Sequence, residues 1–205
     1  MMNKKKGLLI VISGPSGAGK GTICKALLEK RKDLSLSVSA TTRAPREGEK
    51  DGVNYHFLTR EDFQQRIADG KFIEYAEYCQ NFYGTLSSEV DGRLEKGLNV
   101  ILEIEPQGAM KIREKRPDAL FIFIVPPSVG ELRRRLKKRG TETDEVIEER
   151  ISKAAWEISQ AEKYDYIIVN DALEDAVSDF FAVIRGEQLK KEFSGDIIEE
   201  VLKNA

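Results

Sequence analysis

The chain has 205 residues, which is enough for one well-buried core and somewhat short for two independent domains. Hydrophobic residues make up 40% of it and charged residues 33%, and the two signs nearly cancel at a formal net charge of −2. This composition is typical of a soluble globular protein, and it gives no reason to expect non-specific binding to nucleic acid or to a membrane.

The reactive side chains are few and scattered. Cys24 and Cys79 form no CxxC pair, and the single histidine, His56, leaves no ligand cluster for zinc. We interpret both thiols as small structural side chains in a reducing compartment. The apolar run near the start, residues 8–12, is too short for a signal peptide or a membrane span, so we expect a cytoplasmic protein.

The predicted elements begin with a strand, a loop and a helix. "GLLIVI" is a short β-branched run that ends at glycines, and "TICKALLEKR" after it has helical spacing. "NVILEIE", "LFIFIV" and "YDYIIVN" are further apolar runs of strand length, each followed by a helix-like segment. The alternation predicts an α/β fold with a parallel sheet that helices cover on both faces.

Two stretches interrupt this alternation. Residues 39–97 contain turns, tyrosines and short alternating runs, which favour an inserted subdomain with antiparallel strands. "ELRRRLKKRGTETDEVIEERISKAAWEI" reads as two helices joined at Gly140, within a segment of about residues 128–159. We therefore assign a core to residues 7–38, 98–127 and 160–185, followed by a charged helical tail over residues 186–205.

The motif "GPSGAGKGT" follows the first strand directly and opens the first helix, which is the context of a phosphate-binding loop. Backbone N–H groups at a helix start point at an anion, and Lys20 can reach the β and γ phosphates. Gly21 stands where the common pattern has Ser or Thr, so Thr22 is the candidate hydroxyl for Mg²⁺. The predicted loop comprises Gly14, Pro15, Ser16, Gly17, Ala18, Gly19, Lys20, Gly21 and Thr22.

A second cationic site is expected in "SATTRAPREGEKDGVNYHF". Pro45 separates Arg43 from Arg46 and disfavours a helix, so the two arginines belong to a loop. Arginine forks match the oxygens of a phosphate monoester, and Tyr55 and Tyr83 add hydroxyl donors. Taken alone, the stretch also fits a solvated charged loop.

The same stretch closely resembles the acceptor-binding segment of guanylate kinases. Other matches to that family follow in order: "GPSGAGKGT", "GKFIEYAEY", "YGT", "LEIEPQGA", "FIVPPS", "RLKKRGTET" and "YIIVND". The resemblance covers about residues 7–185. It implies a P-loop NTPase core with a GMP-binding insert and a helical lid, and the reversible reaction ATP + GMP → ADP + GDP with Mg²⁺, with dGMP as a second acceptor.

The resemblance also implies roles for residues of the insert. Arg43, Arg46, Tyr55 and Tyr83 would bind the GMP phosphate, with Ser39 nearby. Glu74 matches the residue that reads the base, and Thr85 a hydroxyl that assists it. Guanine presents N1–H and an amino group side by side, so one carboxylate can accept from both, whereas adenine would leave that carboxylate unpaired.

Acidic residues are expected at the end of the strand in "ILEIE". Glu103 and Glu105 alternate, so both should point to one face at the carboxyl end of the strand, where open α/β sheets bind ligands. The family places acidic residues here near the guanine and the metal, often with aspartate at the position of Glu105. A solvated strand-end charge remains the alternative for each residue.

The run "RRRLKKR" would by default be a solvated or nucleic-acid-binding helix face. The resemblance implies instead that Arg135, Arg139 and Arg150 are lid arginines that bind a triphosphate. For Arg133, Arg134, Lys137 and Lys138 we keep the interpretation as solvated charge. Arg135 and Arg139 are four residues apart and share a face. By the same resemblance, Asn170 and Asp171 contact the adenine side of ATP.

The mechanism implied is in-line phosphoryl transfer driven by positioning and charge neutralisation. Two other functions stay open. A guanylate-kinase-like scaffold module would bind phosphorylated peptides without catalysis, although such modules typically lack an intact phosphate loop and lid. A P-loop kinase for another monophosphate acceptor is the second. We expect small-molecule substrates without a nucleic-acid or membrane partner, and either a monomer or a homo-oligomer.

Overall fold

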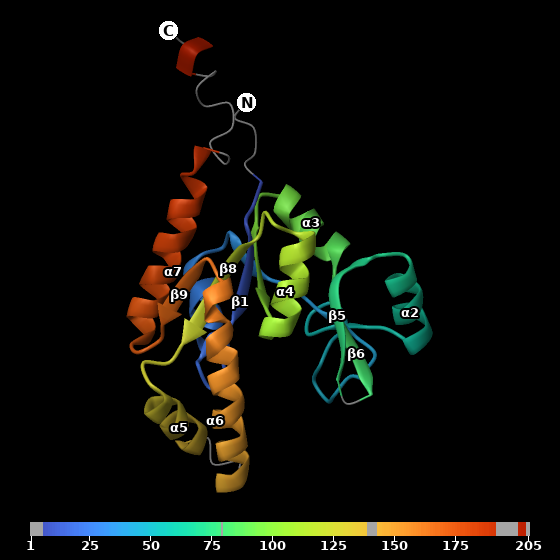
Figure 1. The fold of residues 1–205 in the computed structure, drawn as a ribbon. Helices are drawn as coiled ribbons and strands as arrows, with labels where there is room; N and C mark the ends of the chain where they lie inside the picture. Colours follow the sequence, from blue (N-terminus) through green and yellow to red (C-terminus); the bar gives the residue numbers. More distant parts are fainter. Residues whose placement is uncertain (1–5, 79, 139–142, 192–200, 204–205) are drawn as a thin grey trace.

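The protein is described by a computed structural model that covers residues 6–78, 80–138, 143–191 and 201–203 (Figure 1). Its central sheet has five strands in the order β2-β7-β1-β8-β9, and every neighbouring pair is parallel. These strands are β1 (Leu9–Ser13), β2 (Leu34–Leu36), β7 (Asn99–Glu103), β8 (Leu120–Val125) and β9 (Tyr166–Val169).

Helices cover both faces of this sheet, because its central strands are apolar on both sides. In β1, Ile10 and Ile12 pack toward α1 (Lys20–Lys30) and α7 (Leu173–Gln188), whereas Leu9 and Val11 belong to the core on the opposite face. That opposite face is covered by α3 (Ser87–Glu95), α4 (Pro106–Lys115) and the 3₁₀ helix η1 (Gln160–Lys163). Alternating side chains of one strand therefore supply two separate cores.

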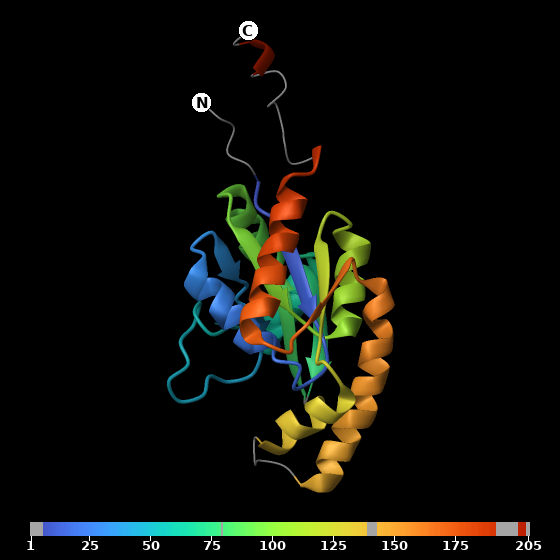
Figure 2. The same ribbon diagram turned by 90° about the vertical axis from the view of Figure 1, so that its left-hand side faces the viewer.

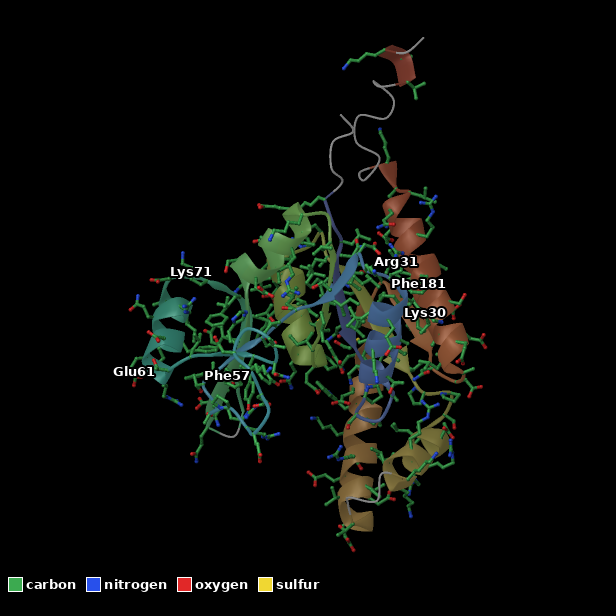
Figure 3. All side chains as sticks on the ribbon, turned by 180° about the vertical axis from the view of Figure 1, so that it is seen from behind. Lys30, Arg31, Phe57, Glu61, Lys71 and Phe181 are labelled. Atoms are coloured by element: carbon green, nitrogen blue, oxygen red, sulfur yellow. The ribbon has the colours of Figure 1, made fainter. Side chains whose placement is uncertain are left out.

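Helices α1 and α7 lie side by side on the first face. The guanidinium of Arg31, just after α1, lies over the ring of Phe181 of α7, 5.6 Å from its centroid (Figure 3). Cys24 of α1 is buried in the same core, and this burial raises the pKa of its thiol to about 12. This agrees with a structural role for Cys24; Cys79 lies outside the described residues.

The insert forms a second, four-stranded sheet in the order β4-β3-β6-β5. Its β5–β6 and β3–β6 pairs are antiparallel, whereas β3 and β4, which residues 42–55 connect, are parallel. Phe63 of α2 stacks between Phe72 and Phe82, with centroids 4.3 and 5.4 Å away. The elements are β3 (Ala40–Thr41), β4 (His56–Phe57), α2 (Arg60–Ala68), β5 (Phe72–Tyr78) and β6 (Asn81–Leu86).

The lid consists of α5 (Val129–Lys138) and α6 (Asp144–Ser159), which extend beyond the end of the central sheet (Figure 2). The two helices share a small apolar core of their own, made by Leu132, Leu136, Ile147, Ile151 and Ala154. Both predicted helices are confirmed; the predicted junction at Gly140 lies outside the described residues. In Figure 1 the lid and the insert lie on either side of the same end of the sheet.

The predicted fold class is confirmed, including the parallel sheet flanked by helices and the four strands expected from apolar runs. The short edge strand β2 was not predicted. The segment boundaries remain predictions; α3 packs on the central core although it falls within residues 39–97, and α7 crosses residue 185. Residues 192–200 and 204–205 of the predicted tail lie outside the described residues. Among the described helices, none has the length and apolarity needed to cross a membrane.

Candidate active site

The predicted phosphate loop connects β1 to α1 at the carboxyl end of the central strand. The first turn of α1 contains Lys20, Gly21 and Thr22. The Lys20 ammonium folds back over the loop and donates to the carbonyl oxygen of Gly14 at 2.6 Å and to that of Pro15 at 3.3 Å. A helix start and an ammonium thus lie together, which is an arrangement suited to a polyphosphate.

At two positions of this loop only glycine fits, because atoms of neighbouring segments lie very close to the loop backbone. A Cβ on Gly14 would lie 2.2 Å from the carbonyl oxygen of Ile124, and one on Gly19 would lie 2.3 Å from Nδ2 of Asn170. Both residues also have positive φ, 153° and 92°. Any other residue would clash and be strained at these positions, so the loop conformation depends on the glycines.

One described lid arginine contacts the phosphate loop, and a second contacts Asn170 beside it. Arg150 of α6 donates from Nη1 to Oγ of Ser16 at 2.9 Å. Arg135 of α5 donates from Nη2 to the Asn170 carbonyl oxygen at 2.9 Å. Both arginines thus join the lid to the core near the phosphate loop, and their binding of a triphosphate stays a prediction; Arg139 lies outside the described residues.

The guanidinium of Arg135 is also paired with a carboxylate, which was not predicted. Nε of Arg135 donates to Oε1 of Glu131 at 2.7 Å, and Arg134 pairs with the same carboxylate. The two guanidinium groups lower the pKa of Glu131 to about 2. Arg133 likewise pairs with Glu148 on the surface, so the cluster is not merely solvated cationic charge.

Asn170 supports the phosphate loop directly. Its Nδ2 donates to the carbonyl oxygen of Ala18 at 2.7 Å, and its side chain is buried. Asp171 follows it and is exposed. The contacts of Asn170 assign it a structural part in holding the loop; contact of either residue with adenine remains a prediction.

Glu103 ends β7 beside the start of α1. A Cβ on Gly21 would lie 3.8 Å from its Oε2. Burial raises the pKa of the Glu103 carboxyl, the positive charge of Lys20 opposes this, and the negative charge of Glu105 adds to it. The acidic group is therefore close enough to the phosphate loop to interact with its lysine.

The strand predicted through Glu105 is too long. Strand β7 ends at Glu103, and Glu105 is the residue before α4, because Pro106 occupies the first turn of that helix and suits a helix start. Glu105 lies close to Glu157 of α6. Burial is the main cause that raises the pKa of the Glu157 carboxyl, and repulsion from Glu105 raises it further.

In the insert, Arg43 is tied to a carboxylate. Its Nη2 donates to both carboxylate oxygens of Glu49, at 2.8 and 2.9 Å, and Glu49 Oε2 also accepts from the backbone N–H of Arg46 at 2.7 Å. This pairing lowers the pKa of the Glu49 carboxyl. Glu49 thus organises the loop that contains both predicted phosphate-binding arginines.

Aromatic rings complete this surface. The guanidinium carbon of Arg43 lies 5.5 Å from the ring centroid of Tyr55 and 6.0 Å from that of Phe57. The rings of Tyr55 and Tyr83 meet edge to face with centroids 6.2 Å apart. Ser39 lies on the neighbouring segment, where its carbonyl oxygen accepts from the N–H of His56. The structure brings Arg43, Tyr55 and Tyr83 together as predicted.

Glu74 of β5 and Thr85 of β6 form the other half of the insert site. The Thr85 hydroxyl donates to Oε1 of Glu74 at 2.8 Å, and only 8% of Glu74 is exposed. Burial raises the pKa of the Glu74 carboxyl, whereas the hydrogen bond from Thr85 and the charge of Lys111 oppose the rise. A buried carboxylate with one oxygen held by a hydroxyl is suited to recognise paired N–H donors.

Glu49 and Glu131 were both missed from the sequence. Glu131 precedes Arg135 by four residues on one helix, and this spacing was a usable signal. Glu49 lies six residues after Arg43 in an irregular loop, where no period relates the two side chains. Only the folded loop brings them together.

Fold and site together define a class of protein. The parts are a parallel α/β core with a phosphate loop, a helical lid from which Arg150 contacts that loop, and an insert that holds arginines and a buried carboxylate. Together they are typical of a P-loop phosphotransferase with a small-molecule acceptor.

Comparison with known proteins identifies the family. The guanylate kinase family model matches residues 6–187. A guanylate kinase from Clostridium perfringens is 57% identical over 194 residues, which are 93% of this chain and 90% of that protein. One from Caldanaerobacter subterraneus subsp. tengcongensis is 52% identical over 197 residues, 96% of each chain. The crystal structure of guanylate kinase from Anaplasma phagocytophilum superposes with a TM-score of 0.70 at 40% identity, covering 93% of this chain and 90% of that one. The chain therefore belongs to the guanylate kinase family.

Proposed function

We propose that this chain transfers the γ-phosphoryl group of ATP to GMP, and also to dGMP, in a reversible reaction that needs Mg²⁺. Family membership supports guanylate kinase activity, with ATP as donor and GMP as acceptor. The observation that carries the acceptor assignment is the buried Glu74 carboxylate with Thr85 bound to it. Oε1 is held in place, and the carboxylate can accept from guanine N1–H and the 2-amino group.

The acceptor phosphate would bind at the aromatic and cationic surface of the insert. Arg43 and Arg46 supply the positive charge, and Tyr55 and Tyr83 supply hydroxyl donors, with Ser39 nearby. The Glu49 contacts support this assignment, because they hold the side chain of Arg43 and the backbone of Arg46 in one loop. The GMP phosphate is itself an anionic nucleophile, so the reaction needs no general base.

The donor would bind at residues 14–22, with Lys20, Arg135, Arg139 and Arg150 offsetting negative charge on the transferring group. Contacts of Arg135 and Arg150 with the loop side of the core support this. Closing the lid would also exclude water that hydrolyses ATP. Asn170 and Asp171 would lie toward the adenine side.

Oxygen ligands near the start of α1 fit Mg²⁺. The hydroxyl of Thr22 lies in the first turn of that helix, and the Glu103 carboxylate lies beside Gly21. Within the described residues no cluster of three or more acidic, His or Cys side chains could hold a metal, and Mg²⁺ in phosphate sites usually needs only one or two protein ligands. The ion would neutralise phosphate charge; Thr22 and the acidic pair Glu103 and Glu105 would orient it.

The biological setting follows from this chemistry. We place the enzyme in purine nucleotide metabolism and GMP recycling in the cytoplasm, with nucleotides as its only required partners. The intact phosphate loop and lid arginines favour catalysis over a phosphopeptide-binding role.

The test is the initial rate of ADP formation with ATP and Mg²⁺ when GMP, dGMP, AMP, UMP or CMP is offered. Turnover restricted to GMP and dGMP is expected, and omission of Mg²⁺ should abolish it. Equal turnover with AMP would contradict the role of Glu74. Binding of GMP without turnover of any acceptor would contradict catalysis and favour a binding module.

A further inference from the structure

The strand that contains Glu74 is irregular at that point. Between the pairs Phe72–Leu86 and Glu74–Thr85, β5 advances two residues while β6 advances one. Ile73 is therefore an extra residue, as in a β-bulge, and Phe72, Ile73 and Glu74 are all buried. A regular strand would send every second side chain to the opposite face, so the irregularity re-aims Glu74.

Each of these three side chains enters a different part of the molecule. Phe72 packs in the aromatic core of the insert, whereas Ile73 packs in the central core with Ala109 and Ile112 of α4. The Glu74 carboxylate lies beside the start of α4, where a Cβ on Gly108 would be 3.7 Å from its Oε2. Helix α4 therefore forms one wall of the Glu74 site.

Two lysines of α4 bind the backbone on both sides of Glu74. Lys115 donates from Nζ to the Phe72 carbonyl oxygen at 3.1 Å, and Lys111 donates to the Tyr75 carbonyl oxygen at 3.3 Å. The lysines are one helical turn apart and thus share a face of α4. They join the core helix to the one segment of the insert that contains the base-reading carboxylate.

The same lysines set the charge around Glu74. The groups that act on its carboxyl are Thr85 of β6, through its hydroxyl and its backbone, and Lys111 and Lys115 of α4. Burial raises the pKa of Glu74, and all of these groups oppose the rise. Both lysines are themselves exposed, so solvent reduces their effect.

We propose that Lys111 and Lys115 are positioning residues for guanine recognition: they hold the carbonyl groups that flank Glu74 and place two positive charges beside its carboxylate. This inference rests on the proposed function and extends it, because it assigns part of the acceptor specificity to a core helix outside the insert. The lysines do not touch the acceptor; they act through Glu74.

The test compares wild type with the double variants Lys111→Met/Lys115→Met and Lys111→Arg/Lys115→Arg. Lys71→Met is the matched control, since Lys71 is an exposed lysine just before β5 (Figure 3). For each we would measure kcat, the KM for GMP and for ATP, and kcat/KM for GMP between pH 5 and 8. GMP affinity by titration calorimetry gives a readout that does not depend on turnover.

Loss of two hydrogen bonds of ordinary strength should raise the KM for GMP about tenfold, with kcat and the KM for ATP within about twofold of wild type. The acid limb of kcat/KM for GMP should move to higher pH by about half a unit, because the carboxylate loses nearby positive charge. The arginine variant should restore both values. In a Glu74→Gln background, the lysine substitutions should leave the pH profile unchanged and have a smaller effect on KM.

Several results would overturn the inference. The first is a Lys111→Met/Lys115→Met variant whose KM for GMP and acid limb match those of Lys71→Met. The second is a change in the KM for GMP that is equally large in the wild-type and the Glu74→Gln backgrounds. If the double variant is unfolded at the assay temperature, Lys111→Met alone is used, because Lys115 still holds Phe72; a wild-type KM for GMP then contradicts the inference. Failure of the proposed function is seen separately, as wild-type protein that neither binds nor phosphorylates GMP.

Discussion

The two regions that we propose to bind phosphate hold their cations with different acceptors. In the phosphate loop, Lys20 donates to neutral backbone carbonyls of Gly14 and Pro15. In the insert, Arg43 donates to the carboxylate of Glu49. A phosphate that binds Lys20 would replace two neutral carbonyl acceptors. A phosphate that binds Arg43 would meet a guanidinium whose charge the Glu49 carboxylate already offsets.

This difference follows from how each region is built. The phosphate loop lies between a buried strand and a helix, and the side chains of Asn170 and Arg150 contact it from other elements. The insert has only a small aromatic core and a long loop, so it uses an ion pair to keep its arginines in order. Substitutions should therefore affect turnover in the first region and acceptor binding in the second.

The largest effect is expected for Lys20→Ala. Removal of a preorganised donor to the transferring group should lower kcat at least ~100-fold. The rate of ADP formation at saturating ATP and GMP measures this. Lys30→Ala, at the other end of the same helix, is the control, and near-normal turnover of Lys20→Ala would remove this lysine from the mechanism.

Glu74→Gln should act on acceptor binding. An amide has one donor group where the carboxylate has an acceptor, so at least one guanine N–H loses its partner, and kcat/KM for GMP should fall about 10- to 100-fold. The KM for ATP should stay within twofold of wild type. Steady-state kinetics with each substrate varied in turn would show this, and an equal loss for both substrates would argue against a base-reading role.

Acid pH should weaken acceptor binding through the same residue. Burial disfavours the charged carboxylate and raises the pKa of Glu74 above 4.5, so protonation begins at a higher pH than for an ordinary glutamate. The KM for GMP should rise as the pH falls toward this pKa. Glu131, whose pKa is lowered to about 2, stays ionised throughout and does not contribute. Glu74→Gln should flatten the profile; an unchanged acid limb in that variant would assign it to another group.

Glu49→Ala tests whether the ion pair of the insert organises the site or competes with the acceptor. The backbone N–H of Arg46 loses its acceptor, and the Arg43 side chain loses its carboxylate partner while it keeps its bond to the Ala44 carbonyl oxygen, so we expect the KM for GMP to rise about tenfold. Glu47→Ala, in the same loop and exposed, is the control. A lower KM for GMP would show that competition outweighs organisation.

The smallest effect is expected for Glu131→Gln in the lid. Arg135 keeps its bond to the Asn170 carbonyl oxygen and loses one partly buried ion pair, so the KM for ATP should change by about threefold or less. Comparison of the KM for ATP with that of Glu148→Gln, an exposed partner of Arg133, would isolate the part due to Arg135. A loss as large as that of Lys20→Ala would mean that Glu131 is essential to the orientation of Arg135.

The sequence by itself determined the features whose causes are local. Apolar runs of strand length predicted four of the five central strands, and the glycines and lysine between a strand and a helix predicted the phosphate loop. The family motifs placed Glu74 and Thr85 in one site, and the structure joins them at 2.8 Å. The three-residue strand β2 gave too short a pattern to be detected.

Only the tertiary structure decided the contacts between segments that are distant in the sequence. Asn170 holds Ala18 from 152 residues away, and no periodic pattern relates two such positions. The pairing of Arg43 with Glu49 depends on the path of an irregular loop. The extra residue in β5, and the contacts of the α4 lysines with the backbone on either side of it, depend on how the insert packs against the core. Local propensities select elements, but the orientation of side chains in a site is set by the packing of those elements on one another.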